Sequence, residues 1–160
     1  MPIFFIQPID DRRREWTNRL LVQRWGSTNV VSRGVLHQAD RLPGFIALLE
    51  GSLVGLVTYH VSGEECEIVT LDSTVEGIGI GSALIQSVRQ AAIEAGCRRL
   101  WLITTNDNLP ALHFYQMRDF HLVAVYPNAL ERSRQLKPEI PTLGLDGIPL
   151  RDEIELEIML

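Results

Sequence analysis

The order of apolar and polar residues along the chain predicts strands mixed with helices. Short segments in which apolar residues are continuous or alternate are typical of strands, and they occupy residues 1–8, 45–50, 53–61, 65–71, 99–105, 121–126 and 153–158. Apolar residues recur at helical spacing over residues 10–25 and 79–95, and Pro110 opens a shorter helix. Residues 27–40 fit either a short strand or a broken helix, and the proline-rich segment 127–151 predicts a long loop.

Three of the predicted strands follow one another through short turns. Gly51 and Ser52 separate the strands 45–50 and 53–61, and a turn at residues 62–64 precedes the next strand. Consecutive strands joined by so few residues pair antiparallel. The chain therefore begins its sheet with an antiparallel set and continues with alternating helices and strands.

Length and composition describe a globular protein. The chain has 160 residues, 46% of them apolar, and it has no apolar run of the ~18 residues that cross a membrane. We expect a single domain over residues 1–160 in the cytoplasm, because the apolar N-terminus is short and lacks the basic leader of a signal peptide. Cys66 and Cys97 lack metal-like spacing and are expected to be buried, reduced thiols.

Charge is unevenly distributed along the chain. The net charge is −5; residues 1–44 hold seven arginines against four acidic residues, whereas residues 45–160 hold eight basic residues against sixteen acidic ones. The acidic second part disfavours nucleic acid as a partner and is consistent with a cationic or amine ligand. Because the histidines show no spacing typical of a metal site, we expect no metal.

Three alternate glycines stand between a predicted strand and a predicted helix. Gly77, Gly79 and Gly81 let the backbone turn sharply and bring its N–H groups close to a ligand. The N-terminus of the following helix adds a positive partial charge, so this segment favours a phosphate or pyrophosphate. The spacing matches neither the dinucleotide fingerprint nor the nucleoside-triphosphate loop, and the glycines alone leave open a helix start without a ligand.

A second segment, residues 108–120, makes the glycine loop more specific. It follows the pattern N-x-x-A-x-x-x-Y-x-x-x-G-F except at its glycine, and the loop follows R/Q-x-x-G-x-G/A except at its first position. Together they resemble the cofactor motifs of the GNAT-type N-acetyltransferases, whose order of elements residues 45–126 follow. The matching positions are Gly79, Gly81, Asn108, Ala111, Tyr115 and Phe120.

The chain departs from the family pattern at two positions. Glu76 stands where the family has arginine or glutamine, which puts an anion near the expected pyrophosphate. We expect this carboxylate to face solvent, because backbone N–H groups do the binding in such loops. Asp119 replaces the glycine before Phe120, and aspartate can adopt a left-handed conformation at some steric cost.

The resemblance implies an α/β fold of the α+β type, with a mixed, mainly antiparallel sheet of about six to seven strands, splayed at its centre and flanked by about four helices. It also implies that a primary amine, in a small molecule or a peptide, attacks acetyl-CoA directly in a ternary complex without a metal. Pairing into a homodimer is common in that family. The residues that the resemblance assigns to acetyl-CoA are Leu71, Ser73, Gly77, Ile78, Gly79, Ile80, Gly81, Ser82, Asn108, Ala111 and Tyr115.

Two residues are candidates for proton transfer. In the resembled family a tyrosine protonates the departing thiolate, and Tyr115 occupies that position, although a core tyrosine is the alternative. An attacking alkylamine is almost fully protonated at neutral pH, so a base or a water chain must take a proton from it. Glu67, on the strand that leads to the loop, is the first candidate base, and Asp72, His60 and Glu65 compete with it.

The acceptor is the part that the sequence describes least. Trp25, Arg33 and Tyr126 are expected to line its site, because the resembled family walls that site with its first helical region and its late loop. Asn108 fits either a hydrogen bond to the cofactor or a helix cap. Two other functions compete with catalysis: a non-catalytic acyl-CoA sensor and a regulatory domain that binds ATP or NAD.

Overall fold

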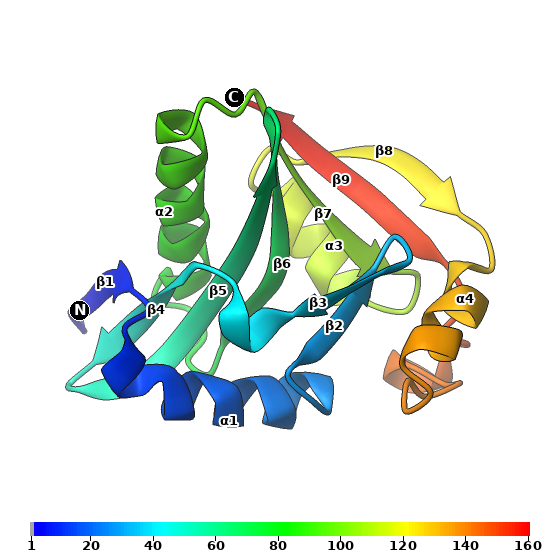
Figure 1. Ribbon diagram of the computed structural model, residues 1–160, viewed down its shortest axis with the longest axis horizontal. Coiled ribbons are helices and arrows are strands. Elements are labelled where there is room, and N and C mark those ends of the chain that lie inside the picture. Colours follow the sequence, from blue (N-terminus) through cyan, green and yellow to red (C-terminus); the bar gives the residue numbers. More distant parts are fainter. Residues whose placement is uncertain (1) are drawn as a thin grey trace.

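The computed structural model describes residues 2–160, and these residues form a seven-stranded sheet, a separate two-stranded hairpin and four α-helices (Figure 1). In spatial order the sheet contains β1 (Phe4–Pro8), β4 (Gly44–Leu49), β5 (Ser52–Ser62), β6 (Glu65–Ser73), β7 (Arg99–Thr105), β9 (Glu153–Met159) and β8 (His121–Tyr126). The hairpin contains β2 (Asn29–Ser32) and β3 (Val35–Gln38), and the helices are α1 (Arg14–Trp25), α2 (Ile80–Glu94), α3 (Leu109–Gln116) and α4 (Ala129–Leu136). In the sheet β6 and β7 are parallel and the other neighbours antiparallel, which confirms the predicted fold class.

Two segments show what the sequence pattern left open or missed. Residues 27–40 contain the β2–β3 hairpin, so the strand interpretation holds there. The predicted long loop over residues 127–151 is wrong in part, because α4 lies inside it. Pro127 and Pro138 flank this helix rather than interrupt it, so the prolines that suggested a loop mark its two ends. Met1, assigned to the first strand from the sequence, lies outside the described residues.

α1 buries only part of its apolar residues. Asp10 accepts the backbone N–H of Arg13 and so caps the short 3-10 turn, Asp11–Arg13, that precedes α1; α1 itself has no side-chain cap. Trp16, four residues before the buried Leu20, is 42% exposed. Thr17, Leu20 and Leu21 form the buried face, since they recur at the i, i+3, i+4 spacing.

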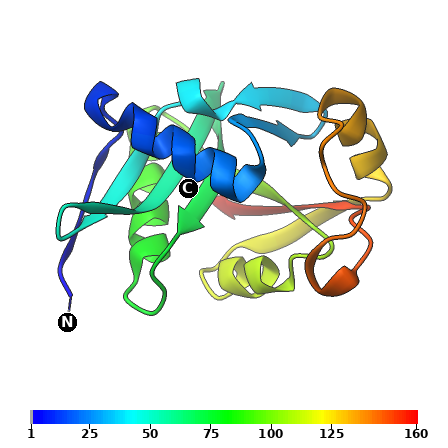
Figure 2. The same cartoon turned by 90° about the horizontal axis from the view of Figure 1, so that it is seen from below.

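Helices and the hairpin cover the two faces of the sheet separately. Figure 2 shows α1 and the β2–β3 hairpin, in blue, on one face, and α2 and α3, in green, on the opposite face. A ligand at the centre of the sheet can therefore be approached from two sides, that of α1 with the hairpin and that of α2 with α3 (Figure 2). Within residues 2–160 no helix is long and apolar enough to span a membrane.

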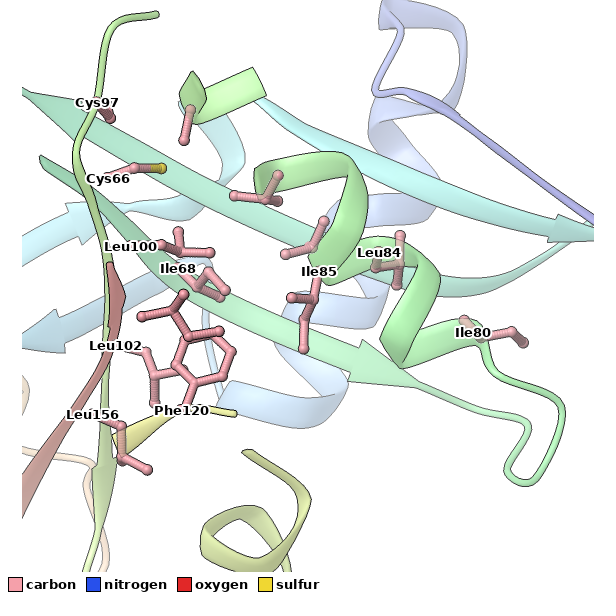
Figure 3. Close-up of a cluster of buried hydrophobic side chains, with 14 of the residues drawn as sticks. Cys66, Ile68, Ile80, Leu84, Ile85, Cys97, Leu100, Leu102, Phe120 and Leu156 are labelled. Atoms are coloured by element: carbon pink, nitrogen blue, oxygen red, sulfur yellow. The ribbon is translucent and has the colours of Figure 1, made fainter. Parts of the chain in front are cut away.

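The main core lies between α2 and the central strands. Figure 3 shows Ile85 of α2 near Ile68 and other apolar side chains of the sheet, with Leu84 and Ile80 of the same core further along the helix. Fully burying an aliphatic side chain of this size stabilises the fold by about 1.5–3 kcal/mol. This packing fixes the first turn of α2, and with it the glycine loop, against β6.

β6 and β7 separate halfway along their length. Residues 65–68 of β6 pair with residues 99–102 of β7. At that point the register between β5 and β6 shifts, and Val69 becomes an extra residue between Ile68 and Thr70. Such a β-bulge bends a strand, and β6 bends away from β7 (Figure 1). The central splay that the resemblance implied is present.

Candidate active site

A cleft of about 680 Å³ lies at the end of β6, between the glycine loop and α3, and we call it the loop cleft. Its lining includes eight of the predicted cofactor residues: Leu71, Ser73, Gly77, Gly79, Ile80, Gly81, Ala111 and Tyr115. Val75, Glu76, Pro110, His113, Phe114 and Arg118 complete the lining. Segments about thirty residues apart in the sequence, the loop and α3, thus face one another across a single cleft.

The remaining three predicted cofactor residues have other contacts. Ile78 packs against the main core. The Ser82 hydroxyl accepts a bond of 2.8 Å from Nε of Arg118. Asn108 accepts the backbone N–H of Ala111 at 3.2 Å and so caps α3, and it also lines the second cleft, which is described below.

The glycines of the loop serve two different needs. Gly79 has φ +89° and precedes the first turn of α2, a conformation that costs a residue with a Cβ roughly 1–2 kcal/mol. Gly81 has ordinary backbone angles, but a Cβ there would lie 2.8 Å from Cζ of Phe114. Gly79 therefore shapes the loop, and Gly81 allows α3 to approach α2.

The loop cleft is electrostatically suited to an anion. The first N–H groups of α2 have no carbonyl partner within the helix and lie at residues 79–81, which line the cleft. Arg118 adds a full positive charge at the same end; its guanidinium lies 3.5 Å from the centroid of the Phe114 ring and donates to the carbonyl of Phe114. Glu76 is exposed at the rim, so water screens its carboxylate. These features fit a pyrophosphate group.

Tyr115 lies at the junction of the loop cleft with a second cleft. Its ring packs edge-on against Phe114 and Phe120, with centroid distances of 5.2 and 5.4 Å. Burial raises the pKa of the Tyr115 hydroxyl, and the nearby Asp72 carboxylate raises it further. Asp119 has φ 69°, the left-handed conformation expected from the sequence, and the turn that it makes brings Phe120 against Tyr115. The Tyr115 hydroxyl stays protonated at neutral pH and can donate a proton.

The second cleft, of about 410 Å³, occupies the opening between β6 and β7, and we call it the splay cleft. Asp72 and Tyr115 both line it. Trp25, at the end of α1, donates its indole N–H to Asp72 at 2.8 Å. Burial raises the pKa of Asp72, and the bonds and charges from Trp25 and Arg24 oppose that rise. A carboxylate with raised proton affinity therefore faces the same space as the tyrosine.

Glu67 lies on the hairpin side of β6 with both carboxylate oxygens occupied. Ser32 of β2 donates to Oε2 at 2.5 Å, and Nε2 of His37, from β3, lies 3.5 Å from Oε1. The imidazole ring of His60, which is paired with Glu67 across β5 and β6, lies 5.5 Å from that of His37. Glu67 is 5% exposed and is absent from the linings of the two clefts described above, so its carboxylate is buried beneath the hairpin.

Arg33 and Tyr126, both expected at the acceptor site, meet in a third cavity of about 290 Å³. The Arg33 guanidinium lies 3.3 Å from the centroid of the Tyr126 ring and donates to Glu153 at 3.4 Å. Glu153 is 2% exposed, and burial raises its pKa although Arg33 opposes the rise. Trp25 lies apart from this pair, in the splay cleft. The structure thus brings together two of the three predicted acceptor residues.

Comparison with known proteins identifies the family. The sequence model of the Acetyltransferase (GNAT) family matches residues 9–120. The chain belongs to this family. Two Bacillus subtilis (strain 168) proteins are similar to this chain over most of their length: YdhI is 42% identical over 153 residues, covering 95% of this chain and 96% of YdhI, and YxbD is 42% identical over 135 residues, covering 84% and 85%.

Solved structures share the GNAT fold with this chain. The IAA acetyltransferase from Bacillus cereus ATCC 14579 has a TM-score of 0.78 at 22% identity, with 99% of this chain and 100% of that chain covered. A GNAT family acetyltransferase from Elizabethkingia anophelis, solved with acetyl-CoA bound, has a TM-score of 0.69 at 17% identity, with 98% of both chains covered. At these identities the likeness concerns the fold.

Four residues that the structure places in or beside the candidate site are missing from the sequence-based interpretation. Ser32 and His37 hold Glu67 from a segment that had no clear helix or strand pattern. Glu153 is one of three alternating acidic residues in β9, and this alternation predicts a strand with one acidic face but indicates no site. Arg118 gave a usable signal, because it lies three residues after Tyr115 in α3's exit turn and a helical neighbour at that spacing faces the same side.

Proposed function

We propose that this protein transfers the acetyl group of acetyl-CoA to a primary amine, by direct attack of the amine in a ternary complex. The observation that carries the proposal is the loop cleft, where the N-terminus of α2, the glycine loop and Arg118 surround a space that also reaches Tyr115. Membership of the GNAT family supports the same reaction. The acceptor is a small molecule or a peptide with a free amine.

The loop cleft supplies the groups that acetyl-CoA needs. Backbone N–H groups at residues 79–82 and the Arg118 guanidinium would bind the pyrophosphate, as helix N-termini and arginines bind phosphates elsewhere. The exposed main chain of Leu71 and Ser73, beyond the bulge in β6, would hold the pantetheine arm by strand-like hydrogen bonds. Acetyl-CoA supplies an activated thioester at the end of that arm.

Tyr115 is proposed as the general acid. It lines both clefts, so its hydroxyl is placed where the arm would enter the splay cleft. When the carbon–sulfur bond breaks, the leaving sulfur takes the phenolic proton. Burial raises the pKa of Tyr115, which keeps the hydroxyl protonated until the thiolate forms.

Glu67 is proposed as the general base, with Asp72 as its competitor. Glu67 is nearly covered by the hairpin, so the proton of the amine would reach its carboxylate through a bridging water. Asp72 lines the splay cleft beside Tyr115, and burial raises its pKa toward the range of a useful base. Replacing each by its amide, Glu67→Gln and Asp72→Asn, separates them: loss of the base lowers kcat by about 10² at neutral pH.

The acceptor is proposed to enter from the side of α1 and the hairpin. Trp25 lines the splay cleft there, and Arg33 with Tyr126 lines the neighbouring cavity. We also propose a cytoplasmic location, where free thiols such as the buried Cys66 and Cys97 remain reduced.

Ligand-dependent thermal unfolding tests the cofactor. The protein is heated with CoA, acetyl-CoA, ATP or NAD; a ligand bound by the native state at about 100 times its Kd stabilises it by ~2.7 kcal/mol. We expect stabilisation by both CoA species and by neither nucleotide. Arg118→Gln should weaken CoA binding about tenfold, whereas the matched Arg98→Gln, at a side chain 77% exposed and paired with Glu64, should not.

Thiol release from acetyl-CoA tests the transfer. The acceptor panel contains spermidine, cadaverine, L-lysine, an aminoglycoside and a short peptide with a free N-terminus. Release that depends on one of these amines, and that falls in Tyr115→Phe, supports the acetyltransferase. Binding of CoA without release by any amine, unchanged by Tyr115→Phe, would instead identify an acyl-CoA sensor. Stabilisation by ATP or NAD alone would identify a nucleotide-binding regulatory domain.

A further inference from the structure

Two histidines, His37 and His60, lie between the buried Glu67 carboxylate and solvent. His37 Nε2 lies 3.5 Å from Glu67 Oε1, and the ring of His37 lies 5.5 Å from that of His60 at an interplanar angle of 59°. His37 is 7% exposed, whereas His60, near the end of β5, is exposed. The groups thus run from buried carboxylate to buried imidazole to solvated imidazole, on three different strands.

A buried base needs an exit for its proton. After each turnover the carboxylate must lose the proton that it took from the amine, and Glu67 has little water around it. A neutral imidazole can accept a proton at one ring nitrogen and release the proton of the other, so it carries protons without moving. His37 contacts Glu67 on one side and His60 on the other, which is the placement that such a carrier requires.

We propose that His37 passes the proton of Glu67 to His60 and so to solvent, while Ser32 fixes the carboxylate by its bond to Oε2. The proposal rests on the proposed role of Glu67 as base. The proton of the amine forms the Oε1–H bond of Glu67; that bond breaks as the Nε2–H bond of His37 forms, and the Nδ1 proton of His37 leaves toward His60. Before the next turnover His37 returns to its Nδ1–H tautomer by exchanging its ring protons with solvent, and no electrons are transferred.

The other charged groups around this relay have partners of their own. Glu153 of β9 interacts electrostatically with Glu67, but the Arg33 backbone and guanidinium both bond to Glu153. Glu65, two residues before Glu67 on β6, is exposed and pairs with Arg99. His37 is therefore the group in contact with Glu67 that can accept a proton.

The pH dependence of kcat tests the relay. His37→Gln is assayed from about pH 7 to pH 10 with acetyl-CoA and the most reactive amine of the panel above. We expect kcat about tenfold below wild type at pH ~7, less than the ~10² for loss of the base, with KM for acetyl-CoA unchanged. The deficit should narrow toward pH ~10, because an alkylamine that is already neutral needs no base. A deficit that is constant with pH, or that appears in KM, overturns the relay.

Chemical rescue separates proton transfer from packing. In His37→Ala, added imidazole should restore much of kcat, whereas pyrazole, a ring of the same size that is not protonated near neutral pH, should not. Equal rescue of kcat by imidazole and pyrazole would mean that the His37 side chain only fills space and transfers no proton. If His37→Ala does not fold, the variant His60→Gln, at an exposed position, tests the relay instead. We expect its kcat to be about threefold below wild type at neutral pH, with a smaller difference at high pH. A His60→Gln enzyme with the kcat of wild type contradicts the relay. His121→Gln, at an exposed position of β8, is the matched control.

Three results distinguish failure of this inference from failure of the proposed function. In the Glu67→Gln background, His37→Gln should cause no further loss, because residues of one relay are not additive; independent losses overturn the relay while leaving the acetyltransferase intact. A wild-type protein that releases no thiol with any amine overturns the proposed function and the relay with it. A wild type that is active and unaffected by both Glu67→Gln and the histidine variants overturns the relay and transfers the role of base to Asp72.

Discussion

The two sides of the sheet centre are built in different ways. On the loop side, the cleft comes from residues 71–81 and 110–118, two short segments that each carry a recognisable pattern. On the hairpin side, Ser32 of β2 and His37 of β3 contact Glu67 of β6, and Arg33, between β2 and β3, bonds to Glu153 of β9. The loop side is built from backbone geometry and a helix terminus, whereas the hairpin side is built from buried ionisable groups.

This difference has a functional consequence. A site made of backbone N–H groups and glycines binds a constant chemical group, because its donors do not depend on side-chain identity. A site made of side chains from a hairpin and a late helix can change its acceptor by single substitutions. The loop side is therefore suited to one donor molecule, and the hairpin side is where we propose that acceptor choice and proton handling are set.

The largest expected effect is on the loop side. Tyr115→Phe removes the proposed acid without emptying its place between Phe114 and Phe120, so kcat should fall by about 10³ while CoA still binds. Steady-state kinetics with thermal unfolding in CoA measures both quantities. Tyr59→Phe, on β5 where the ring stacks on Phe45, is the matched control and should retain wild-type kcat. A Tyr115→Phe enzyme with normal kcat would leave the tyrosine as a core residue.

The next effect concerns the buried charge of the hairpin side. Arg33→Met removes the cation that pairs with Glu153, whose exposed fraction is 2%. It should lower the free energy of unfolding by about 2 kcal/mol near neutral pH. This value is below that of a fully buried ion pair, because the Arg33 side chain is 39% exposed and water screens its charge. Burial raises the pKa of Glu153, so the carboxylate is protonated earlier as pH falls, and the deficit should shrink toward acid pH. Denaturant unfolding at several pH values measures this.

A second substitution sharpens the same experiment. Adding Glu153→Gln to Arg33→Met removes the unpaired buried charge, and we expect the double variant to recover most of the lost stability and to lose the pH dependence. If the double variant were as unstable as Arg33→Met, the packing of the Arg33 guanidinium over Tyr126 would be the main contribution.

The same contrast explains what could be predicted from the sequence. Gly79, Gly81 and Tyr115 lie in local patterns whose physical meaning is fixed by a few neighbouring residues, and the helix that carries each is amphipathic or capped. Glu67 could be predicted as a candidate base from its position on the strand that leads to the loop. Its partners Ser32 and His37 could not be predicted, because strands of four residues are too short to show a clear apolar–polar alternation. Contacts between residues 35 positions apart depend on how the hairpin packs, which no local pattern encodes.

A smaller effect on the loop side separates strain from binding. Gly79 and Gly51 have φ +89° and +80°, and a Cβ at either would meet no atom within 4 Å, so alanine should destabilise both by about 1 kcal/mol through backbone strain alone. Gly79 lines the loop cleft, whereas Gly51 lies in the β4–β5 turn. Calorimetry with CoA should show about tenfold weaker binding for Gly79→Ala and unchanged binding for Gly51→Ala. Equal affinities would mean that the loop backbone does not contact the ligand.

The smallest expected effect is on the wall of the hairpin side. Lys137, after α4, donates from Nζ to the carbonyls of Trp25 and Asn29 at 2.7 Å each, which ties α4 to the end of α1. Burial lowers the pKa of Lys137, so between that lowered value and the ordinary value of about 10.4 the unfolded chain binds more protons than the native protein. Stability should then rise with pH in this range, by less than 1 kcal/mol, relative to Lys137→Met, which lacks the titrating group. Unfolding curves of the two proteins at about pH 8, 9 and 10 measure the difference; parallel curves would mean that Nζ is as well solvated in the native protein as in the unfolded chain, and that α4 is held by its apolar contacts alone.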